Sequence, residues 1–283
     1  MSSLAERVDA LAATPADLPL DAGVHDVVRE LLDALEIGAV RAAQRGTDNR
    51  WQAVPWVKRG ILLGFRAGSM ADLSIPGGDG ARFSFVDKST FPPRHFVVAD
   101  GVRVVPGGST IRRGTYVAPG VVCMPPMFVN VGAWVGSGTM IDSHALVGSC
   151  AQIGERVHLS AAAQVGGVLE PVNASPVVIE DDVLIGGNCG VYEGTVVRER
   201  AVLAAGVVLT RGTPVFDLVH EQVYRATADA PLEIPAGAVV VPGARAVARG
   251  WGAAQGLSLQ APVIVKYRDA KTDLATALEA WLR

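Results

Sequence analysis

The sequence predicts a mainly β protein whose largest part is a parallel β-solenoid. Three observations support this fold class: a six-residue repeat of aliphatic residues, mostly small residues at the fifth position of each hexad, and Gly, Asn or Asp at the fourth. An α-helix has a period of 3.6 residues and a simple strand a period of two, so neither explains a long repeat of six. Hexapeptide repeats are typical of solenoids in which each hexad makes one side of a coil.

The first position of each hexad is expected to form the core. From Val105 to Val165 this position is aliphatic in every hexad except at Cys123, and the series resumes in a new frame from Ile179 to Leu209. Strands in neighbouring coils lie about 4.8 Å apart, so each first-position side chain would stack on its counterparts above and below. Val, Ile and Leu suit such a column because they pack well on a pleated surface.

The fifth and fourth positions have different tasks. The fifth also points inward, where there is less room, and it is mostly small: Ala133, Thr139, Ala145, Ala151, Val157 and Ala163. The fourth must turn the chain at a corner, and a left-handed backbone conformation is easiest there for Gly, then for Asn or Asp. Residues at the fourth position include Gly108, Gly114, Gly120, Gly132, Gly138, Asp182, Asn188, Gly194, Gly206 and Gly212.

The repeat is interrupted twice. Eight extra residues, Pro171 to Val178, separate the two frames, and a longer stretch over about residues 215–233 precedes two more hexads that begin at Ile234 and Val240. Loops that protrude from a solenoid often carry ligand-binding residues. We therefore expect these excursions near a binding site, and a neutral insertion is the alternative.

The non-repeating ends divide the chain into three predicted parts: a helical domain over residues 1–101, the solenoid over 102–249 and a C-terminal segment over 250–283. Apolar residues at helical spacing predict the helices of the first part, and β-branched residues predict a strand in the last. The expected elements are helices at 24–43 and 54–66, a loop at 76–80, a Gly-rich connector at 250–256, a strand at 262–268 and a helix at 271–283.

Composition excludes several classes of function. The net charge is −3 and the sequence has no run of Lys or Arg, which disfavours nucleic acid and anionic membranes as partners. The N-terminus lacks the apolar stretch of a signal peptide, and no stretch is long enough to span a bilayer. Cys123, Cys150 and Cys189 are odd in number and form no Cys-x-x-Cys pair, so we expect reduced packing residues in a cytoplasmic protein.

Several motifs resemble those of the tetrahydrodipicolinate N-succinyltransferase family. The most specific is GTMIDSHALVGSCAQIGERVHLS at residues 138–160; the others are GGVLEP at 166–171, IED at 179–181, GVRVVP at 101–106, VKRGILLGFR at 57–66 and VIVKYRDAKT at 263–272. The resemblance implies a left-handed parallel β-helix with three hexads per coil, and a homotrimer with active sites between neighbouring solenoids. It also implies an acyltransferase of lysine and diaminopimelate biosynthesis. Succinyl-CoA would be its co-substrate, with no tightly bound cofactor and no metal.

In that family, succinyl moves from the thioester to the amine of the open-chain acceptor, 2-amino-6-oxopimelate. Such a reaction needs a positioned neutral amine, a base and oxyanion donors, but no covalent enzyme intermediate. The resemblance assigns Asp142 as the base or amine-orienting group and Arg103 as a ligand of a substrate carboxylate, which a guanidinium can grip bidentately. Ser149 and Gly167 lie in the matched motifs and are expected to line the substrate site.

One position departs from the family pattern. Relatives carry a Glu where this chain has Gly190, and the nearest acid is Glu193, which is therefore a candidate catalytic carboxylate or a plain surface residue. Lys266 and Arg268 are candidates for binding the phosphates of CoA, since no GxxxxGK[ST] phosphate loop occurs. His144 is close to Asp142 in the sequence and is the candidate for a histidine at the site, although a surface role is the simpler interpretation.

Two other functions fit a hexapeptide solenoid. A related N-acetyltransferase would act on the same or a similar amino-dicarboxylate, and the sequence does not locate the extra cation that a succinyl group needs. A γ-type carbonic anhydrase needs three His ligands for zinc across neighbouring coils and subunits. His144, His158 and His220 show no convincing spacing for such a site. A purely structural solenoid is a further alternative.

Overall fold

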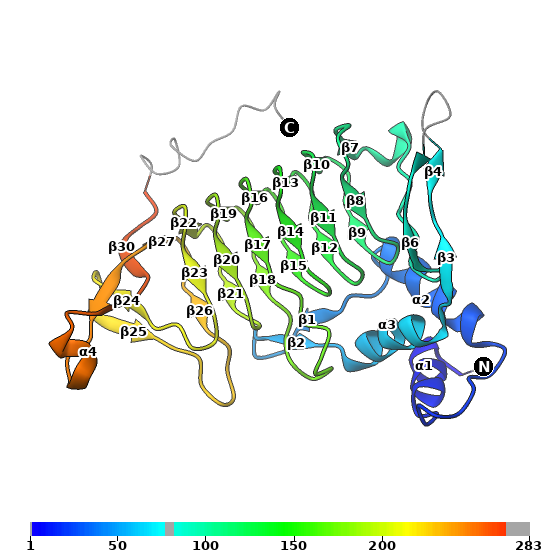
Figure 1. Ribbon diagram of the computed structural model, residues 1–283, viewed down its shortest axis with the longest axis horizontal. Helices are drawn as coiled ribbons and strands as arrows, with labels where there is room; N and C mark the ends of the chain where they lie inside the picture. Colours follow the sequence, from blue (N-terminus) through cyan, green and yellow to red (C-terminus); the bar gives the residue numbers. More distant parts are fainter. Residues whose placement is uncertain (1, 77–81, 270–283) are drawn as a thin grey trace.

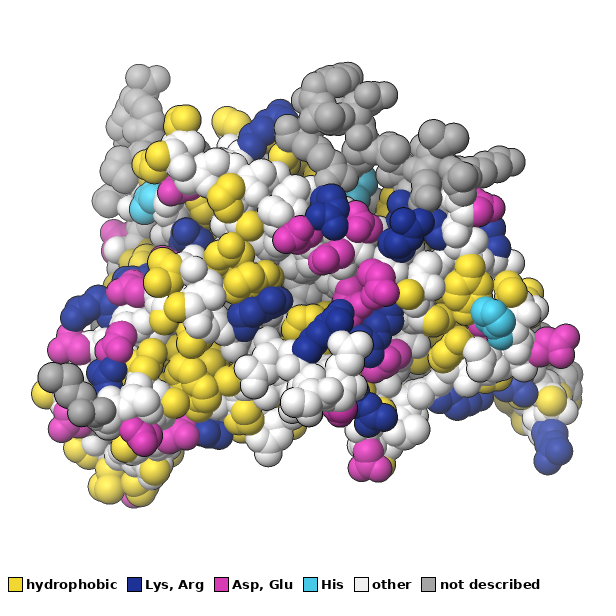
Figure 2. Space-filling view, turned by 180° about the vertical axis from the view of Figure 1, so that it is seen from behind, with side chains coloured by type: hydrophobic (Ala, Val, Ile, Leu, Met, Phe, Trp, Pro, Cys, Tyr) yellow, Lys and Arg dark blue, Asp and Glu magenta, His cyan; other side chains and the backbone are white. Residues whose placement is uncertain are grey.

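The computed structural model describes residues 2–76 and 82–269, and it confirms the predicted fold class. A β-solenoid runs through the middle of the molecule, with helices α1 to α3 at the end where the solenoid begins and two hairpins and a strand at the other (Figure 1). Figure 2 shows that charged side chains of both signs are interspersed across the rear face of the molecule. No helix within the described residues is long and apolar enough to cross a membrane.

Except at β27 (Ala238–Val241), which is four residues long, the strands of the coils have two residues, and they build three parallel sheets. The solenoid strands of the first sheet are β7 (Arg103–Val104), β10 (Val122–Cys123), β13 (Met140–Ile141), β16 (His158–Leu159), β19 (Leu184–Ile185), β22 (Val202–Leu203) and β27 (Ala238–Val241). The second sheet contains β8 (Thr110–Ile111), β11 (Phe128–Val129), β14 (Leu146–Val147), β17 (Gln164–Val165), β20 (Gly190–Val191) and β23 (Val208–Leu209). The third contains β9 (Tyr116–Val117), β12 (Trp134–Val135), β15 (Gln152–Ile153), β18 (Val178–Ile179), β21 (Val196–Val197) and β26 (Glu233–Ile234).

The register shows three hexads per coil. Ile141 pairs with Cys123 on one side and with Leu159 on the other, 18 residues away each time. Ile153 pairs with Ile179 instead, because the loop over residues 171–178 adds eight residues without changing the register of the stack. The first-position side chains from Ile141 to Val165 are completely buried, so the aliphatic column is the core, as predicted.

The first coil differs from the prediction. Val104, and not Val105, pairs with Cys123, so the expected start of the aliphatic series at Val105 is wrong by one residue. The segment between Val104 and Ile111 is one residue longer than a later hexad, and it contains two glycines with positive φ, Gly107 and Gly108. This coil lies at the edge of the stack, where Val104 is 37% exposed and the repeat is under less constraint.

The corners adopt the predicted left-handed backbone at most fourth positions. Positive φ occurs at Gly114, Gly132 and Asn188, but also at residues the sequence pattern did not mark: His144, Cys150, Arg156, Ala162 and Arg200. Gly212 lies at a fourth position without a positive φ. The coil geometry therefore imposes this conformation even on residues that disfavour it, because each coil must turn at the same height.

The helices of the N-terminal part cover one flank of the first coils. Helices α2 (Val24–Glu36) and α3 (Pro55–Ala67) agree with the sequence prediction, except that α2 ends seven residues early. Gly38 (φ +75°) follows its last turn, and an added Cβ there would lie 2.9 Å from the Tyr116 ring. The chain then forms the hairpin of β1 (Ala43–Arg45) and β2 (Trp51–Ala53), which the sequence analysis missed.

The sequence analysis also missed α1 (Leu4–Ala12), which Ser3 and Glu6 begin with reciprocal capping hydrogen bonds. One extended hairpin precedes the solenoid: β3 (Met70–Asp72) pairs with β6 (Val86–Lys88), and between them in the chain β4 (Ile75–Pro76) pairs with β5 (Arg82–Phe83). A 3₁₀ turn at Val98–Asp100 leads into β7. The helices share a second apolar cluster with two solenoid residues, Val131 and Cys150.

The excursion over 215–233 contains a hairpin of β24 (Val215–Asp217) and β25 (Gln222–Tyr224). The predicted C-terminal strand is present as β30 (Val263–Tyr267), which inserts between β24 and β27 in the first sheet. The Gly-rich connector contains a short helix, α4 (Gly250–Ala254), and lies between the paired strands β28 (Ala244–Ala246) and β29 (Ser258–Gln260). The helix expected at 271–283 lies outside the described residues.

Asp217 anchors this C-terminal assembly. Its buried carboxylate accepts hydrogen bonds from the Tyr267 hydroxyl (2.7 Å) and from the backbone N–H of Val219 (2.9 Å), and it lies 2.9 Å from His220 Nδ1. Burial by itself would raise the pKa of Asp217, but these hydrogen bonds stabilise the ionised form and hold the pKa at about 2. The carboxylate therefore ties β30 to the hairpin at neutral pH.

Truncation of the core column provides a test of the packing. Ile153→Ala removes a fully buried side chain and should lower the free energy of unfolding by about 2–5 kcal/mol, because the coils on both sides cannot collapse into the cavity. Urea unfolding measures this change. The control Ile37→Ala, at a side chain that is 75% exposed, should change it by less than about 0.5 kcal/mol. Equal effects of the two substitutions would contradict the assigned core.

Candidate active site

The coil has three corners, and the predicted catalytic and substrate-binding residues lie at definite places on it. The first corner joins the first sheet to the second, the second corner joins the second sheet to the third, and the third corner leads back to the first sheet. Asp142 comes directly after β13 and lies at the first corner. Ser149, Gly167 and Glu193 follow strands of the second sheet and lie at the second corner.

Asp142 is held by the coil while its carboxylate stays accessible. Its backbone N–H donates to the carbonyl of Leu159 in the next coil (2.9 Å), and its Oδ1 accepts from the backbone N–H of Ser143 (2.7 Å). The side chain is 31% exposed, and its Oδ2 lies 3.7 Å from Nε2 of His158. A half-buried carboxylate beside an imidazole is a suitable acceptor for a proton of an attacking amine.

His158 is the site residue that sequence reasoning passed over. It pairs with Met140 in the preceding coil, so its imidazole lies beside Asp142, whereas His144 occupies an exposed corner with φ +62°. The signal was present in the sequence, since His158 is one 18-residue coil beyond Met140. His144 and His158 are 14 residues apart, which is not a multiple of a coil, so these two histidines do not stack on each other.

Arg103 lies on β7, the edge strand of the first sheet, and its exposed side chain belongs to the same sheet as the strand before Asp142. Only β10 separates β7 from β13, so the backbones of the two strands are about 10 Å apart. A guanidinium and a carboxylate on one sheet, two strands apart, can hold opposite ends of a small amino-dicarboxylate. The structure thus brings Arg103, Asp142 and His158 to one region.

Ser149 and Gly167 touch each other at the second corner. The carbonyl of Ser149 accepts from the N–H of Val168 (3.1 Å). A Cβ added to Gly148 would lie 2.1 Å from the amide nitrogen of Gly167, and one added to Gly167 would lie 2.6 Å from the nitrogen of Ser149. The two coils therefore meet backbone to backbone, and only glycine fits at these two positions.

A groove of about 800 Å³ opens beside this contact. It lies between the loop over 171–178 and residues 228–231, and its lining includes Gly167, Tyr192, Glu193 and Arg211. The exposed Glu193 accepts a hydrogen bond from the backbone N–H of Arg211 through Oε2 (2.7 Å). Both excursions predicted from the sequence thus border one groove, which has room for a small-molecule ligand.

Tyr192 occupies the space beside Gly190, the position where the family pattern has Glu. An added Cβ at Gly190 would lie 2.4 Å from the Tyr192 ring, and one at Gly166 in the neighbouring coil would lie 2.8 Å from the same ring. The Tyr192 ring thus packs directly against the backbone of both glycines. This chain therefore lacks the family carboxylate at Gly190, and the phenol side chain of Tyr192 lines the groove there.

The candidate CoA ligands lie on or just after β30. Lys266 Nζ lies 3.6 Å from Asp269, and both side chains are largely exposed. Arg268 Nη1 donates to the carbonyls of Asp182 (2.7 Å) and Arg200 (3.4 Å), so its guanidinium also fixes the end of the strand to two coil corners. This structural use of Arg268 was not foreseen from the sequence.

The cysteines do not provide a nucleophile. Burial raises the pKa of the Cys123 and Cys150 thiols to about 12, and burial also raises the pKa of Cys189. Since only a thiolate is an effective nucleophile, these thiols are packing residues at neutral pH. Among residues 2–76 and 82–269, no group of three His, Cys, Asp or Glu side chains is placed to hold a metal ion.

Two family models and one solved structure are similar to this chain. Residues 3–67 match the family model described as the N-terminal region of tetrahydrodipicolinate N-succinyltransferase, and residues 176–211 match the hexapeptide repeat of succinyl-transferase. A Campylobacter jejuni protein provisionally named as a 2,3,4,5-tetrahydropyridine-2-carboxylate N-succinyltransferase has a similar fold, with a TM-score of 0.52 at 16% identity. The similarity covers 89% of this chain and 64% of that one.

Three relatives named 2,3,4,5-tetrahydropyridine-2,6-dicarboxylate N-succinyltransferase match nearly the whole chain. The Polynucleobacter asymbioticus protein is 40% identical over 95% of this chain and 93% of its own. The Bradyrhizobium diazoefficiens protein is 43% identical over 92% and 90%, and the Paramagnetospirillum magneticum protein is 39% identical over 100% and 99%.

The solenoid and the matched repeat define an acyltransferase of the hexapeptide-repeat class. The level and extent of identity are more specific than the fold. The chain belongs to the family of 2,3,4,5-tetrahydropyridine-2,6-dicarboxylate N-succinyltransferases, also called tetrahydrodipicolinate N-succinyltransferases. The family and the enzyme class that the motifs predicted are thereby confirmed.

The backbone contact at the second corner can be tested with Gly148→Ala. The new methyl group would collide with the Gly167 amide, so we expect the coils to separate locally at a cost of about 1–3 kcal/mol of unfolding free energy. Succinyl transfer should fall with it, because the groove wall moves. The control is Gly212→Ala: the added Cβ would lie 3.9 Å from its nearest neighbour, Thr210 Oγ1, and Gly212 has no positive φ. If Gly148→Ala melts and turns over like this control, the contact is not tight in solution.

Proposed function

We propose that this protein transfers the succinyl group of succinyl-CoA to the amine of tetrahydrodipicolinate in its open-chain form, a step of lysine and diaminopimelate biosynthesis. The observation that carries the proposal is the match to enzymes named for this activity, at about 40% identity along more than 90% of both chains. The site residues provide the physical support, since they supply a proton acceptor and a cation for a dicarboxylate.

In the proposed mechanism, the neutral amine attacks the thioester carbonyl directly. A C–N bond forms, the C–S bond breaks, and CoA leaves as the thiol after one amine proton has been passed on. Asp142 accepts a hydrogen bond from the amine and orients its lone pair, and its carboxylate takes the proton as positive charge develops on nitrogen. His158, 3.7 Å from that carboxylate, stabilises it when the imidazole is protonated.

Arg103 would bind a carboxylate of the acceptor and thereby place the amine near Asp142. A guanidinium suits this role because its paired N–H groups match the two oxygens of a carboxylate. Fixing one end of the acceptor on the same sheet that carries Asp142 limits the rotation of the amine, and such positioning supplies a large part of the rate enhancement.

A homotrimer would complete the site. Arg103 and Asp142 belong to the first sheet and the first corner, whereas Ser149, Gly167 and Glu193 belong to the second corner, one full side of the coil away. We propose that the first corner of one subunit faces the second corner of its neighbour, and that the pantetheine arm lies along the groove between them. Ser149 and Gly167 would then line the substrate site, and Glu193 would offer a second carboxylate.

The CoA phosphates would lie near Lys266 and Arg268. A cytoplasmic location remains a prediction. An N-acetyltransferase acting on the same acceptor is the closest alternative, and an acyl-donor panel separates the two. The carbonic anhydrase alternative has no support in the described residues, because none of His144, His158 and His220 belongs there to a group of three side chains that could hold a metal ion.

Asp142→Asn tests the proposed base. The substitution keeps the Oδ1 acceptor for the Ser143 N–H but removes the charge, so the protein should fold normally while kcat falls about 10²–10⁴-fold. Release of the CoA thiol measures the rate, with 2-aminopimelate as a stable acceptor. The control Asp17→Asn changes an exposed residue near the N-terminus, far from Asp142 in the sequence, and should retain full activity. Wild-type turnover by Asp142→Asn would exclude a role for this carboxylate in proton transfer.

Mixed trimers test whether two subunits share each site. Asp142→Asn and Gly167→Trp should each be inactive alone, because one lacks the proton acceptor and the other blocks the groove. When the two are co-expressed, some interfaces combine the intact first corner of one subunit with the intact second corner of the other. We expect activity to return to about a quarter of wild type when subunits mix at random in equal amounts. Mixed trimers without activity would place the whole site within one chain.

A further inference from the structure

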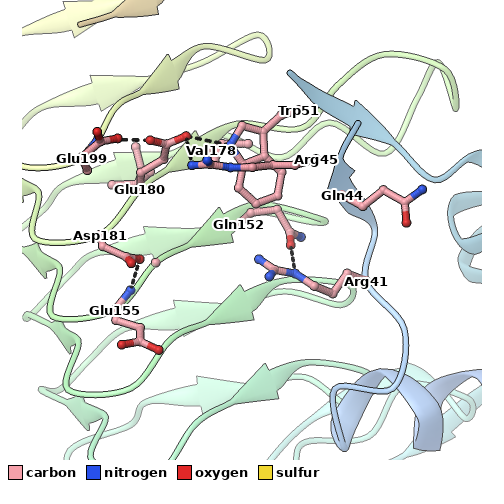
Figure 3. Close-up of a pocket in the computed structure, with 12 residues that line it drawn as sticks. Arg41, Gln44, Arg45, Trp51, Gln152, Glu155, Val178, Glu180, Asp181 and Glu199 are labelled. Atoms are coloured by element: carbon pink, nitrogen blue, oxygen red, sulfur yellow. Dashed lines mark hydrogen bonds and ion pairs between the residues drawn. The ribbon is translucent and has the colours of Figure 1, made fainter. Parts of the chain in front are cut away.

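A second cavity lies at the third corner, away from the proposed acyl-transfer site. It has a volume of about 670 Å³ and is enclosed by the segment that begins with Arg41, the β1–β2 hairpin, and the corner loops after β15, β18 and β21. Figure 3 shows that the guanidinium of Arg41 points from the N-terminal side toward Asp181 and Glu155 on the opposite wall. Asp142 and Gly167 lie at the other two corners and do not line this cavity.

Arg41 is held firmly but has no anionic partner. Its Nε donates to Oε1 of Gln152 (3.0 Å), and its guanidinium stacks 3.9 Å from the centre of the Trp134 ring and 5.4 Å from that of Trp51. Gln152 is buried and cannot turn, because its Nε2 donates to the carbonyls of Cys150 and Ala151. Within the described residues, neither terminal nitrogen of Arg41 has a hydrogen-bond or ion-pair partner, so both are available to a ligand.

The environment of Arg41 makes a bound anion favourable. Burial lowers the pKa of Arg41 to about 10, because the guanidinium has lost water without gaining an adjacent carboxylate; the more distant Asp181 offsets only part of this effect. A carboxylate that approached both terminal nitrogens would recover the lost solvation with two charge-assisted hydrogen bonds. With the guanidinium stacked on Trp134, its two terminal nitrogens point into the cavity (Figure 3).

The other arginine in the cavity is already neutralised. Arg45 pairs with Glu180 (2.7 Å), which is buried and also accepts from Arg198 (2.9 Å) and from the indole N–H of Trp51 (2.9 Å). Burial alone would raise the pKa of Glu180, but hydrogen bonding with Glu199 and Trp51 and the charges of Arg198 and Arg45 hold this pKa below its usual value, so Glu180 remains ionised. Arg45 and Glu180 thus join the hairpin to the solenoid and leave Arg41 to bind a ligand.

The signs of the charges decide which ligand fits. The lining contains two arginines and four carboxylates, those of Glu155, Glu180, Asp181 and Glu199. Three of these acids are already compensated: Arg45 and Arg198 pair with Glu180, Arg156 pairs with Glu155 (2.8 Å), and the neighbouring Glu180 raises the pKa of Glu199. Asp181 is therefore the acid that faces Arg41; it would repel the second carboxylate of a dicarboxylate, and a simple amine would leave Arg41 without its anion. A molecule with one carboxylate and one ammonium group satisfies both walls: the carboxylate faces Arg41, and the ammonium faces Asp181.

From this arrangement we propose that the third-corner cavity binds a free α-amino acid with no net negative charge. The carboxylate would be gripped by the terminal nitrogens of Arg41 above Trp134, and the ammonium group would lie against Asp181, whose Oδ1 also accepts from the backbone N–H of Glu155 (2.8 Å). The proposal does not depend on the acyl-transfer reaction, because none of the residues assigned to that reaction takes part.

Calorimetric titration of the full-length protein without CoA tests the proposal, with tryptophan fluorescence as a second readout. L-alanine or L-lysine should bind saturably and change the emission of the tryptophans that flank Arg41. Succinate and n-propylamine should not bind, and L-glutamate should bind more weakly than L-alanine. No saturable response to either L-alanine or L-lysine at millimolar concentration, or a stronger response to succinate, would overturn the proposal.

Three variants locate the binding. Arg41→Met keeps an unbranched chain against the tryptophans but removes the fork, and it should weaken binding about tenfold or more. Asp181→Asn retains the acceptor for the Glu155 N–H and should also weaken binding, so it carries the test if Arg41→Met misfolds. The control Arg50→Met changes an exposed arginine of the same hairpin that does not line the cavity. Unchanged affinity in Asp181→Asn, or an equal loss in the control, contradicts the assigned site.

A fourth variant separates this cavity from the acceptor site, which also recognises an amino acid. Arg103→Ala removes the proposed carboxylate ligand of the acceptor and should leave the binding of L-alanine or L-lysine unchanged. If binding is lost in Arg103→Ala and retained in Arg41→Met, the amino acid occupies the acyl-transfer site and the proposed second site does not exist. Failure of succinyl transfer in the wild type would leave this comparison unaffected.

Discussion

The stacking of aliphatic side chains in an 18-residue register is the constraint on which the rest of this structure depends. Each first-position residue, such as Ile141 or Ile153, is buried between counterparts one coil away on either side. Because the side chains point alternately in and out, a slip of one residue would expose the whole column. The eight-residue excursion lies at a corner, where it leaves the pairing of Ile153 with Ile179 intact.

This register decides which candidate site residues lie close together at each corner of the coil. Residues that share a corner in successive coils lie one strand spacing apart, whereas residues at different corners are separated by a full side of the coil. Asp142 and His158 meet because β13 and β16 are neighbours, and Ser149 meets Gly167 because their coils touch through glycine backbones. One chain by itself thus places the candidate site residues in two groups, at two different corners of the coil.

The N-terminal hairpin illustrates how charge is managed against the outer face of the third sheet. Glu180 is buried with two arginines and an indole N–H around it, so its charge is satisfied entirely by protein groups. Arg41, which lines the same cavity, contacts the neutral amide of Gln152 and the aromatic rings of Trp134 and Trp51. A half-buried cation without an adjacent anion is costly, and Arg41 is such a cation beside an open cavity.

The sequence by itself determined the coil: the period of six gave the strands, the burial of the column and the places of both excursions, because a periodic core must repeat wherever its residues do. Motifs within it also indicated the family and the candidates Asp142, Arg103 and Gly167. The tertiary structure alone decided which side chains meet across coils and between segments. The contact of His158 with Asp142, the Tyr192 ring on Gly190 and the stacking of Arg41 on Trp134 depend on distances between residues far apart in the chain. The one-residue shift at Val104 arose at the end of the stack, where no preceding coil enforces the register.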